Sequence, residues 1–531
     1  MENKEYTKAE LNKMSFEQVT ELLLKQQFEI KYANERIDLL TEELNLMMSK
    51  KYGSSSEKKV DENQITFFNE IESVMDKEGP VESETEKISY TRKKRRKGQR
   101  DEELSNLPVE VIEHTISDDI LEKELGKDYY VLKVENYKKL KFKPAEFIVE
   151  EHHLSVYKSR ENGKILRADH PVELMENSLV TPSIAAGVIN AKYINHQPLN
   201  RIEQEFNRLG VILRRQVMAD WMIKLTERYL SLIYDRMRTE LFSQGQIHAD
   251  ETPVTVTKDG RKAGSKSYMW VYRSLESNPH NVVLYDYRKT RAGYNLEDYL
   301  KDYKGVIVCD GYQAYHSFES NRFGDIKIAG CWVHLLRKFK DSIKSAGGSD
   351  KKKRKFLLAD EAINMIQEII HEDNNLKELT SEERLDKRQT VIRPLVEGFF
   401  EWVKLHKDDV TRGSNTGKAF TYALNQEPYL KTFLDFPDVP TGNNAAERAI
   451  RPFTLGRKNW QIIDTVSGAQ NSAILYALAE TSKANNLKPY EYFKYLLEEI
   501  PKHMDDHNLD FLEELLPWSD TLPEICRMKT K

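Results

Sequence analysis

The stretch Val306-Ile307-Val308-Cys309-Asp310, VIVCD in one-letter code, decides the fold that we predict for this chain. Four consecutive apolar residues are typical of a central strand that is buried on both faces of its sheet. The carboxylate that ends the run leaves the core at the carboxyl edge of the strand, where α/β sheets bind their ligands. The sequence therefore predicts an α/β sheet with an acidic group at its edge.

Further strands are predicted on both sides of this run, and a helix at Leu296–Tyr303 precedes it. The predicted strands are Gln246–Val256, Tyr268–Arg273, Val282–Tyr287 and Ile326–Cys331. Residues 334–435 are strongly helical and charged in pattern, and a last helical stretch runs from about Asn443 to Trp518. The fold class that we expect is therefore multidomain, with α and α/β parts.

A pair of helices is predicted before the sheet. Pro198 is placed to open a helix that continues to Leu209, Gly210 supplies a tight turn, and a second helix runs from about Arg215 to Tyr229. Helix, short turn and helix is the outline of a helix-turn-helix, and base-contacting side chains then lie at the start of the second helix. The residues at that position are Arg214, Arg215 and Gln216.

The N-terminal part carries a heptad pattern with apolar residues at alternating spacings of three and four. The seam consists of Val19, Leu23, Gln26, Ile30, Ala33, Ile37, Leu40, Leu44 and Met47. One interpretation is a coiled coil between two copies of the chain, and the other is an amphipathic helix packed on its own chain. The absence of a neighbouring apolar segment favours the coiled coil.

Two segments of different composition lie between this helix and the helix pair. Residues 51–107 have few apolar residues and are predicted to be a linker that holds a basic arm for DNA phosphates. The arm consists of Arg92, Lys93, Lys94, Arg95, Arg96 and Lys97. Residues 108–178 are predicted to be a small β-rich module, with strands at Tyr129–Val134 and Phe147–Val156.

Composition sets outer limits on the function. The chain has 531 residues, 39% hydrophobic and 31% charged, which fits several soluble globular domains. There is no apolar run long enough for a membrane helix and no signal peptide, so we expect a cytoplasmic protein with no membrane partner. Three scattered cysteines offer no disulfide framework. The net charge of −5 leaves any affinity for DNA to local basic clusters.

Three carboxylates are candidates for metal-dependent phosphoryl transfer: Asp250 and Asp310 at strand ends, and Glu447 in a predicted helix. Two Mg²⁺ ions held by carboxylates can activate a nucleophile and stabilise the leaving oxygen at a DNA phosphate. The third acid also has basic neighbours that can hold DNA, namely Arg448, Arg451, Arg457 and Lys458. Each acid taken singly is equally compatible with a solvated or capping role, so the residues alone leave both interpretations open.

The sequence motifs around these acids resemble those of the IS66 family of bacterial insertion-sequence transposases. They are HADETPV at 248–254, CDGYQAY at 309–315, CWVHLLRKF at 331–339 and NNAAERAIRPFTLGRKNW at 443–460. YGSSSEK at 52–58, ALAETSKANNLKPYEYF at 477–493 and ELLPW at 514–518 extend the resemblance to nearly the whole chain. It implies a DDE transposase with a ribonuclease-H-like core, in which Asp250, Asp310 and Glu447 are the first, second and third metal-binding acids.

The resemblance also implies partners and cofactors. We expect two Mg²⁺ or Mn²⁺ ions per site, double-stranded DNA (terminal inverted repeats and target DNA), a homodimer or higher oligomer, nucleoid association and companion proteins from the same element. The helical stretch would be an insertion into the core, with His334, Arg337 and Lys338 facing DNA near the site. A solvated amphipathic face is the alternative for these three.

One departure from the family concerns zinc. Family members usually carry two CxxC pairs between the basic run and the helix-turn-helix, whereas residues 108–178 contain no cysteine. The histidines of that region match no strong ligand spacing. We therefore expect this degenerate module to fold without structural zinc.

These observations give a predicted domain order and a predicted function. The expected segments are a leucine-zipper-like coiled coil at 15–50, a linker at 51–107, the cysteine-free module at 108–178, a helix-turn-helix region at 179–240, a catalytic core at 241–470 with an insertion at about 345–435, and a helical region at 471–531. The predicted function is binding of terminal inverted repeats with strand cleavage and strand transfer. The alternatives are an inactive or repurposed DNA-binding derivative, and a nuclease that cuts without rejoining.

Overall fold

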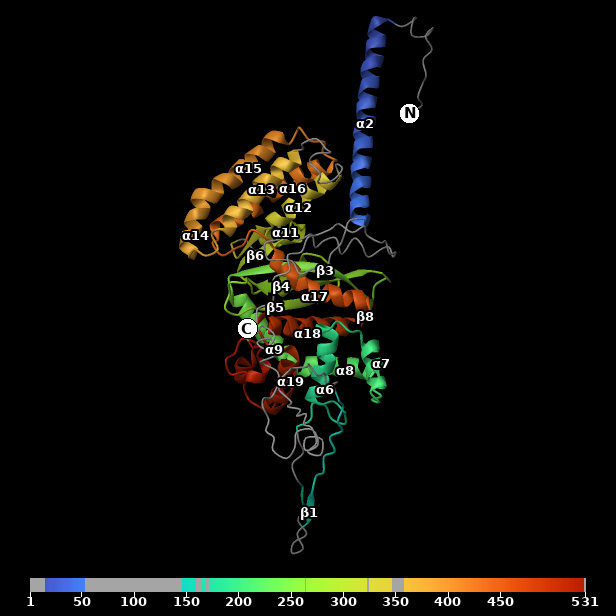
Figure 1. Cartoon of the computed structure of the whole chain (residues 1–531), viewed down its shortest axis with the longest axis vertical. Coiled ribbons are helices and arrows are strands. Elements are labelled where there is room, and N and C mark those ends of the chain that lie inside the picture. The colour runs from blue at the N-terminus through green and yellow to red at the C-terminus, as the bar shows by residue number, and fades with distance from the viewer. Residues whose placement is uncertain are drawn as a thin grey trace, which may run out of the picture. The chain divides into compact units, whose positions relative to one another are not determined.

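The computed structural model describes residues 15–52, 146–158, 165–167, 172–262, 264–321, 324–345 and 358–529 (Figure 1). The predicted linker beyond residue 52, the basic arm at 92–97, the expected strand at Tyr129–Val134 and most of the cysteine-free module lie outside these residues. Within them, helices and one central sheet form a mixed helical and sheet structure, as the sequence pattern predicts. None of the described helices is both long and apolar enough to span a membrane.

The central sheet has the strand order β5-β4-β3-β6-β7. Its bounds are β3 Gln246–Lys258, β4 Lys266–Ser274, β5 Val283–Arg288, β6 Gly305–Cys309 and β7 Ile326–Gly330. The first three strands pair antiparallel, and β6 and β7 add on in parallel beside the first half of β3. All five predicted strands are confirmed, with ends shifted by a few residues.

One strand was missed by the sequence analysis. Strand β8, Ile462–Thr465, pairs in parallel with the second half of β3, beyond the point where β6 stops. The stretch was assigned to a continuous helical region because four residues are too few to show alternation. The long strand β3 therefore has two parallel partners, one at each end.

The residues of the VIVC run point alternately to two hydrophobic cores. Val306 and Val308 belong to a core that they share with the inserted helices, while Ile307 and Cys309 belong to the core on the opposite face. All four side chains are buried. The prediction of a central strand that is covered on both faces is confirmed, and the period-two geometry of a strand is the reason that one short run feeds two cores.

Two layers of helices cover the two faces of the central sheet (Figure 1). The inserted layer consists of α12 Trp332–Ser345, α13 Leu358–Asn374, α14 Ser381–Lys387, α15 Arg393–His406 and α16 Asn415–Lys431. The other layer contains α6 Pro182–Ile189, α9 Ser231–Ser243, α17 Asn444–Trp460, α18 Val466–Ala484 and α19 Pro489–Glu499. Two short helices, α10 Tyr294–Tyr299 and α11 Gln313–Asn321, flank β6 in the chain. The first of these begins two residues earlier and ends four residues earlier than predicted.

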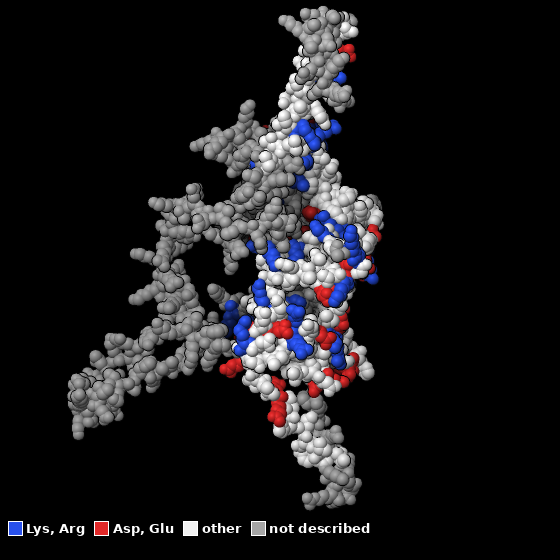
Figure 2. All heavy atoms as spheres, turned by 90° about the vertical axis from the view of Figure 1, so that its right-hand side faces the viewer, with Lys and Arg blue, Asp and Glu red and all other residues white. Residues whose placement is uncertain are grey.

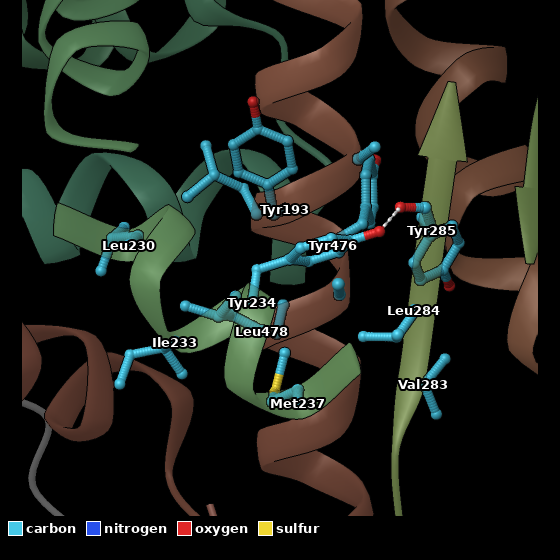
Figure 3. Close-up of a cluster of buried hydrophobic side chains, with 14 of the residues drawn as sticks. Tyr193, Leu230, Ile233, Tyr234, Met237, Val283, Leu284, Tyr285, Tyr476 and Leu478 are labelled. Atoms are coloured by element: carbon cyan, nitrogen blue, oxygen red, sulfur yellow. Dashed lines mark hydrogen bonds between the residues drawn. The ribbon is translucent and has the colours of Figure 1, made fainter. Parts of the chain in front are cut away.

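Tyrosines connect α9 to the sheet, and the turn that follows α6 to α18 (Figure 3). The hydroxyl of Tyr234 donates to the carbonyl oxygen of Tyr285 at 2.8 Å. The rings of Tyr193 and Tyr476 meet edge to face, with centroids 5.0 Å apart. Such contacts fix the polar ends of large side chains inside an apolar core, which holds this layer against β5 in one arrangement.

The predicted helix pair is present. Helix α7 spans Leu199–Arg208, Gly210 has the positive φ of 84° that a tight turn requires, and α8 spans Arg215–Leu225. The second helix ends earlier than predicted, because the chain passes through a π-helical turn at Thr226–Leu230 before α9. The helix pair is thus continuous with the core of the protein.

The expected strand at Phe147–Val156 is wrong. Residues 146–155 are exposed and form no strand, and a small hairpin begins only at Val156, with β1 Val156–Lys158 antiparallel to β2 Ile165–Arg167. An alternating pattern marks a strand only where one of its faces is buried, and these side chains have no such cover.

Candidate functional site

Asp250 lies in the middle of the sheet. It is half-buried on β3, opposite Val271 of β4 in the strand register. Burial, together with the negative charges of Glu251, Asp310 and Glu447, raises the pKa of Asp250 well above its usual range. The same interactions show that acids from three separate parts of the chain gather around this position.

Asp310 follows directly after the last residue of β6, at the edge where the sequence analysis placed it. Its Oδ1 accepts a hydrogen bond of 2.9 Å from the backbone N–H of Tyr312, which turns the chain into α11. Because β6 is parallel to the first half of β3, the carboxyl end of β6 brings this side chain toward Asp250.

Glu447 lies in the first turn of α17, where the helix dipole favours a negative charge. Both of its oxygens accept hydrogen bonds from Arg337 of α12: Nη1 is 2.7 Å from Oε1, and Nη2 bonds Oε2. The Nε2 atom of His334 is 3.6 Å from Oε1. Burial alone would lower the pKa of His334, but interactions with Cys331 and Glu447 raise it to about 9. A carboxylate and two cationic groups therefore form one partly buried cluster.

Asn443 fixes the start of α17 against the sheet, and its side chain is completely buried. Its Nδ2 donates to the carbonyl oxygen of Ala249, and its Oδ1 lies 2.8 Å from Nδ1 of His248. Burial lowers the pKa of His248 to about 4, so the neutral ring donates this bond. The backbone N–H of Asn443 also donates to the sulfur of Cys331. Asn443 therefore joins the residues just before Asp250, the residue before α12 and the start of the helix that carries Glu447.

A fourth acid belongs to the same region and was not predicted. The side chain of Glu251 is 1% exposed, pairs with Arg291 and accepts a 2.9 Å hydrogen bond from the hydroxyl of Tyr315. Burial and the charge of Asp310, opposed by Arg291, raise the pKa of Glu251 to about 7. Its position beside Asp250 in HADETPV was the available clue, but only the structure shows that both side chains are enclosed.

The structure divides the predicted DNA-contacting residues into two groups. Arg337 and His334 face Glu447, and Arg457 donates to Thr252 Oγ1 and to the carbonyl oxygen of Pro253. Exposed residues form the other group: Arg214, Arg215 and Gln216 at the start of α8, and Lys338, Arg448 and Lys458 on α12 and α17. Arg448 also pairs with Glu276, and Lys338 lies 4.5 Å from the ring centroid of Tyr422. Arg451 is half-buried.

Figure 2 shows the face of the molecule that carries α7, α8 and β8 in Figure 1. A band of Lys and Arg side chains runs along this face, with acidic side chains interspersed. Local positive charge of this kind attracts phosphates even where the whole chain is slightly acidic.

Comparison with family models places this chain in the class of transposases. The model described as "Transposase IS66 family" matches residues 177–471, which is more than half of the chain. The models "IS66 C-terminal element" and "Transposase C of IS166 homeodomain" match residues 477–518 and 39–112. The chain belongs to the IS66 family of transposases, and the resemblance found in its sequence motifs is confirmed.

Three similar proteins come from Sinorhizobium fredii (strain NBRC 101917 / NGR234). The uncharacterized protein y4qI is 27% identical over 503 residues, which are 92% of this chain and 90% of that protein. The uncharacterized proteins y4jD and y4hP are 27% and 26% identical, and cover 68% and 71% of this chain and 70% and 68% of their own lengths. The likeness to the first relative thus extends well beyond the central sheet.

Proposed function

We propose that this transposase is a DDE-type enzyme that binds the terminal inverted repeats of an insertion sequence and cuts and joins DNA at the acids Asp250, Asp310 and Glu447. The observation that carries the proposal is the convergence of β3, the end of β6 and α17, which brings Asp310 and Glu447 toward the half-buried Asp250. The strand order, with parallel β6 and β7 beside an antiparallel β5-β4-β3 unit, supports a ribonuclease-H-like core. Incubation with labelled element ends and Mg²⁺ tests it, because cut and joined products distinguish a transposase from a nuclease or an inactive derivative.

The chemistry of the acids fits a divalent metal. Hard oxygen ligands are those that Mg²⁺ and Mn²⁺ prefer, and a buried group of like charges gains most from a cation. Two such ions would activate the attacking oxygen and stabilise the leaving 3′ oxygen. Asp250 and Asp310 would hold them together with Glu447, whose oxygens in this structure are both bonded to Arg337. Among the described residues, no three acid, histidine or cysteine side chains already converge as a metal-binding group.

Residues near the acids would position the acids and the bound DNA. Asn443 holds the third acid's helix on β3, and the pairing of Arg291 with Glu251 balances one negative charge next to Asp250. The exposed Lys338 and, at the other end of α17 from Glu447, Lys458 would bind DNA phosphates, and the basic arm at 92–97 would add further phosphate contacts.

We further propose that the α7–α8 pair binds DNA through Arg214 and Arg215, which are exposed at the start of α8. Replacing both with Ala should weaken binding to an element end by about ten- to a hundredfold and reduce the salt dependence by about two phosphate contacts. A gel-shift titration at several salt concentrations measures both quantities. Lys224→Ala, on the same helix with its side chain 55% exposed, is the matched control and should bind like the wild type. Equal losses in both proteins would show a general charge effect and exclude recognition by the start of α8.

The N-terminal helix is proposed to join two copies of the chain. Helix α2 spans Phe16–Tyr52, and the seam side chains Leu23, Ile30, Ile37 and Leu44 are each more than half exposed. The chain itself therefore leaves this apolar stripe open to water, and a parallel or antiparallel second copy would cover it with the same heptads. Two copies would also suit an enzyme that holds two DNA ends.

Replacing Ile30 and Ile37 with Asp should convert the oligomer to a monomer, because charges in the seam would be desolvated in the pair. Light scattering coupled to size exclusion gives the mass in solution. Asn34→Asp with Thr41→Asp places the same charges on exposed positions of the same helix outside the seam, and should leave the mass unchanged. An Ile30/Ile37 variant with wild-type mass would show that this helix does not join the copies.

A further inference from the structure

Arg337 is a buried arginine inside a cluster of acids. Its side chain is 10% exposed, and its two Nη atoms hold both oxygens of Glu447. The carboxylate of Asp250 lies within electrostatic range of the same guanidinium. Its Nε is buried and has no hydrogen-bond partner in the described part of the chain. This arginine therefore retains one buried donor that the described part of the chain leaves unused.

The pairing with Glu447 is in conflict with the role of that acid. A carboxylate whose two oxygens both accept from one guanidinium has its charge balanced already, and it attracts a divalent cation less strongly than an unpaired one. A guanidinium also binds phosphate with the same two-pronged geometry that it uses for a carboxylate. A DNA phosphate at the acids would thus compete with Glu447 for Arg337.

We propose that Arg337 exchanges Glu447 for a phosphate of the bound DNA, so that the third acid turns to the metal ions only when DNA occupies the site. This inference rests on the proposed function, because it takes the acids to be a metal-dependent DNA site. It makes Arg337 a phosphate-binding residue that also couples DNA binding to completion of the metal site. Its neighbour on the same turn of helix, His334, lies 3.6 Å from Glu447 in the paired arrangement.

The first test measures Mn²⁺ binding to the full DNA-free chain by electron paramagnetic resonance. Arg337→Lys keeps the positive charge but removes the two-pronged donor, so Glu447 is released. We expect Arg337→Lys to bind Mn²⁺ about tenfold more tightly than the wild type, which is the strength of one charge-assisted contact. The gain should disappear when Glu447→Gln is added. Tightening that persists in the double variant, or none in Arg337→Lys, would overturn the proposal.

The second test measures binding of an element-end duplex without metal. Glu447→Gln frees Arg337 for phosphate and should tighten DNA binding severalfold, and the gain should be lost when Arg337→Gln is added. A gain that is equal in both backgrounds would come from the removed negative charge alone and would contradict the exchange. Circular dichroism on each variant checks that the fold is kept, and Arg337→Lys replaces Arg337→Gln if the latter does not fold.

Asp250→Asn separates this inference from the proposed function. If the acids bind metal, Asp250→Asn should weaken Mn²⁺ binding in the wild-type and the Arg337→Lys backgrounds alike. Unchanged Mn²⁺ binding in both would show that the proposed metal site itself is wrong. Weakened binding in both, with no gain from Arg337→Lys, would leave the metal site in place and reject only the exchange.

Discussion

Replacing Asp250 with Asn, Asp310 with Asn or Glu447 with Gln, one at a time, is expected to reduce strand cleavage and strand transfer together by about 10³-fold or more. Each change removes a negative oxygen ligand from the proposed metal site while keeping the shape of the side chain. Binding of DNA should be unchanged or slightly tighter in the two Asp variants, because a negative charge near the phosphates is lost, and severalfold tighter in Glu447→Gln if Arg337 is freed for phosphate. Cleavage of a labelled element end in Mg²⁺, beside a gel-shift on the same DNA, measures both properties.

Glu427→Gln is the matched control for these three substitutions. Glu427 is a partly enclosed carboxylate, 18% exposed, which pairs with Lys404 and Lys431 in the inserted helical layer. Its loss should leave cleavage at the wild-type rate. A Glu447→Gln protein that also nicks at the wild-type rate would remove Glu447 from the site, and the third acid would then have to be sought among the carboxylates of the inserted helices.

Asn443→Ala is expected to reduce cleavage about a hundredfold, the effect of a displacement of roughly 1 Å at an active site. The substitution leaves the carbonyl oxygen of Ala249 and the ring N–H of His248 buried without their partner, at a cost of about 1–3 kcal/mol each. The thermal unfolding midpoint should therefore fall as well, by roughly 5–10 °C. Because the start of α17 loses its side-chain hydrogen bond to β3, Glu447 is displaced even at temperatures where the protein stays folded.

Thr481→Val separates this positioning role from a loss of stability. Thr481 is completely buried and exchanges hydrogen bonds of 3.0 and 2.9 Å with the backbone of Val283, which joins α18 to β5. Its substitution should lower the unfolding midpoint by a similar amount and leave cleavage at 25 °C close to the wild-type rate. If both variants lose cleavage in proportion to stability, Asn443 is structural only and has no part in placing the third acid.

Much of the fold follows from short-range patterns. The VIVCD run predicted a strand buried on both faces with an acid at its carboxyl end, and β6 has this form. The positive φ of Gly210 and the start of α8 at Arg215 also agree with the residue pattern. These features are local, because a strand's burial and a helix's ends depend mainly on the residues within them. The four-residue β8 and the exposed residues 146–155 lie at the limit of such patterns, and both were predicted wrongly.

The sequence by itself determined five strands of the central sheet, the helix pair, the family and the choice of the three candidate acids. Local residue patterns predicted the strands and helices, and long sequence motifs in a fixed order identified the family and the acids. Only the tertiary structure decided what those acids touch. The pairing of Glu447 with Arg337 spans 110 residues of chain, and the bond from Asn443 to Ala249 spans 194. No local periodicity encodes such contacts. They exist because the start of α17 is held on β3 and meets α12 there, where burial forces each charged or polar group to find a partner.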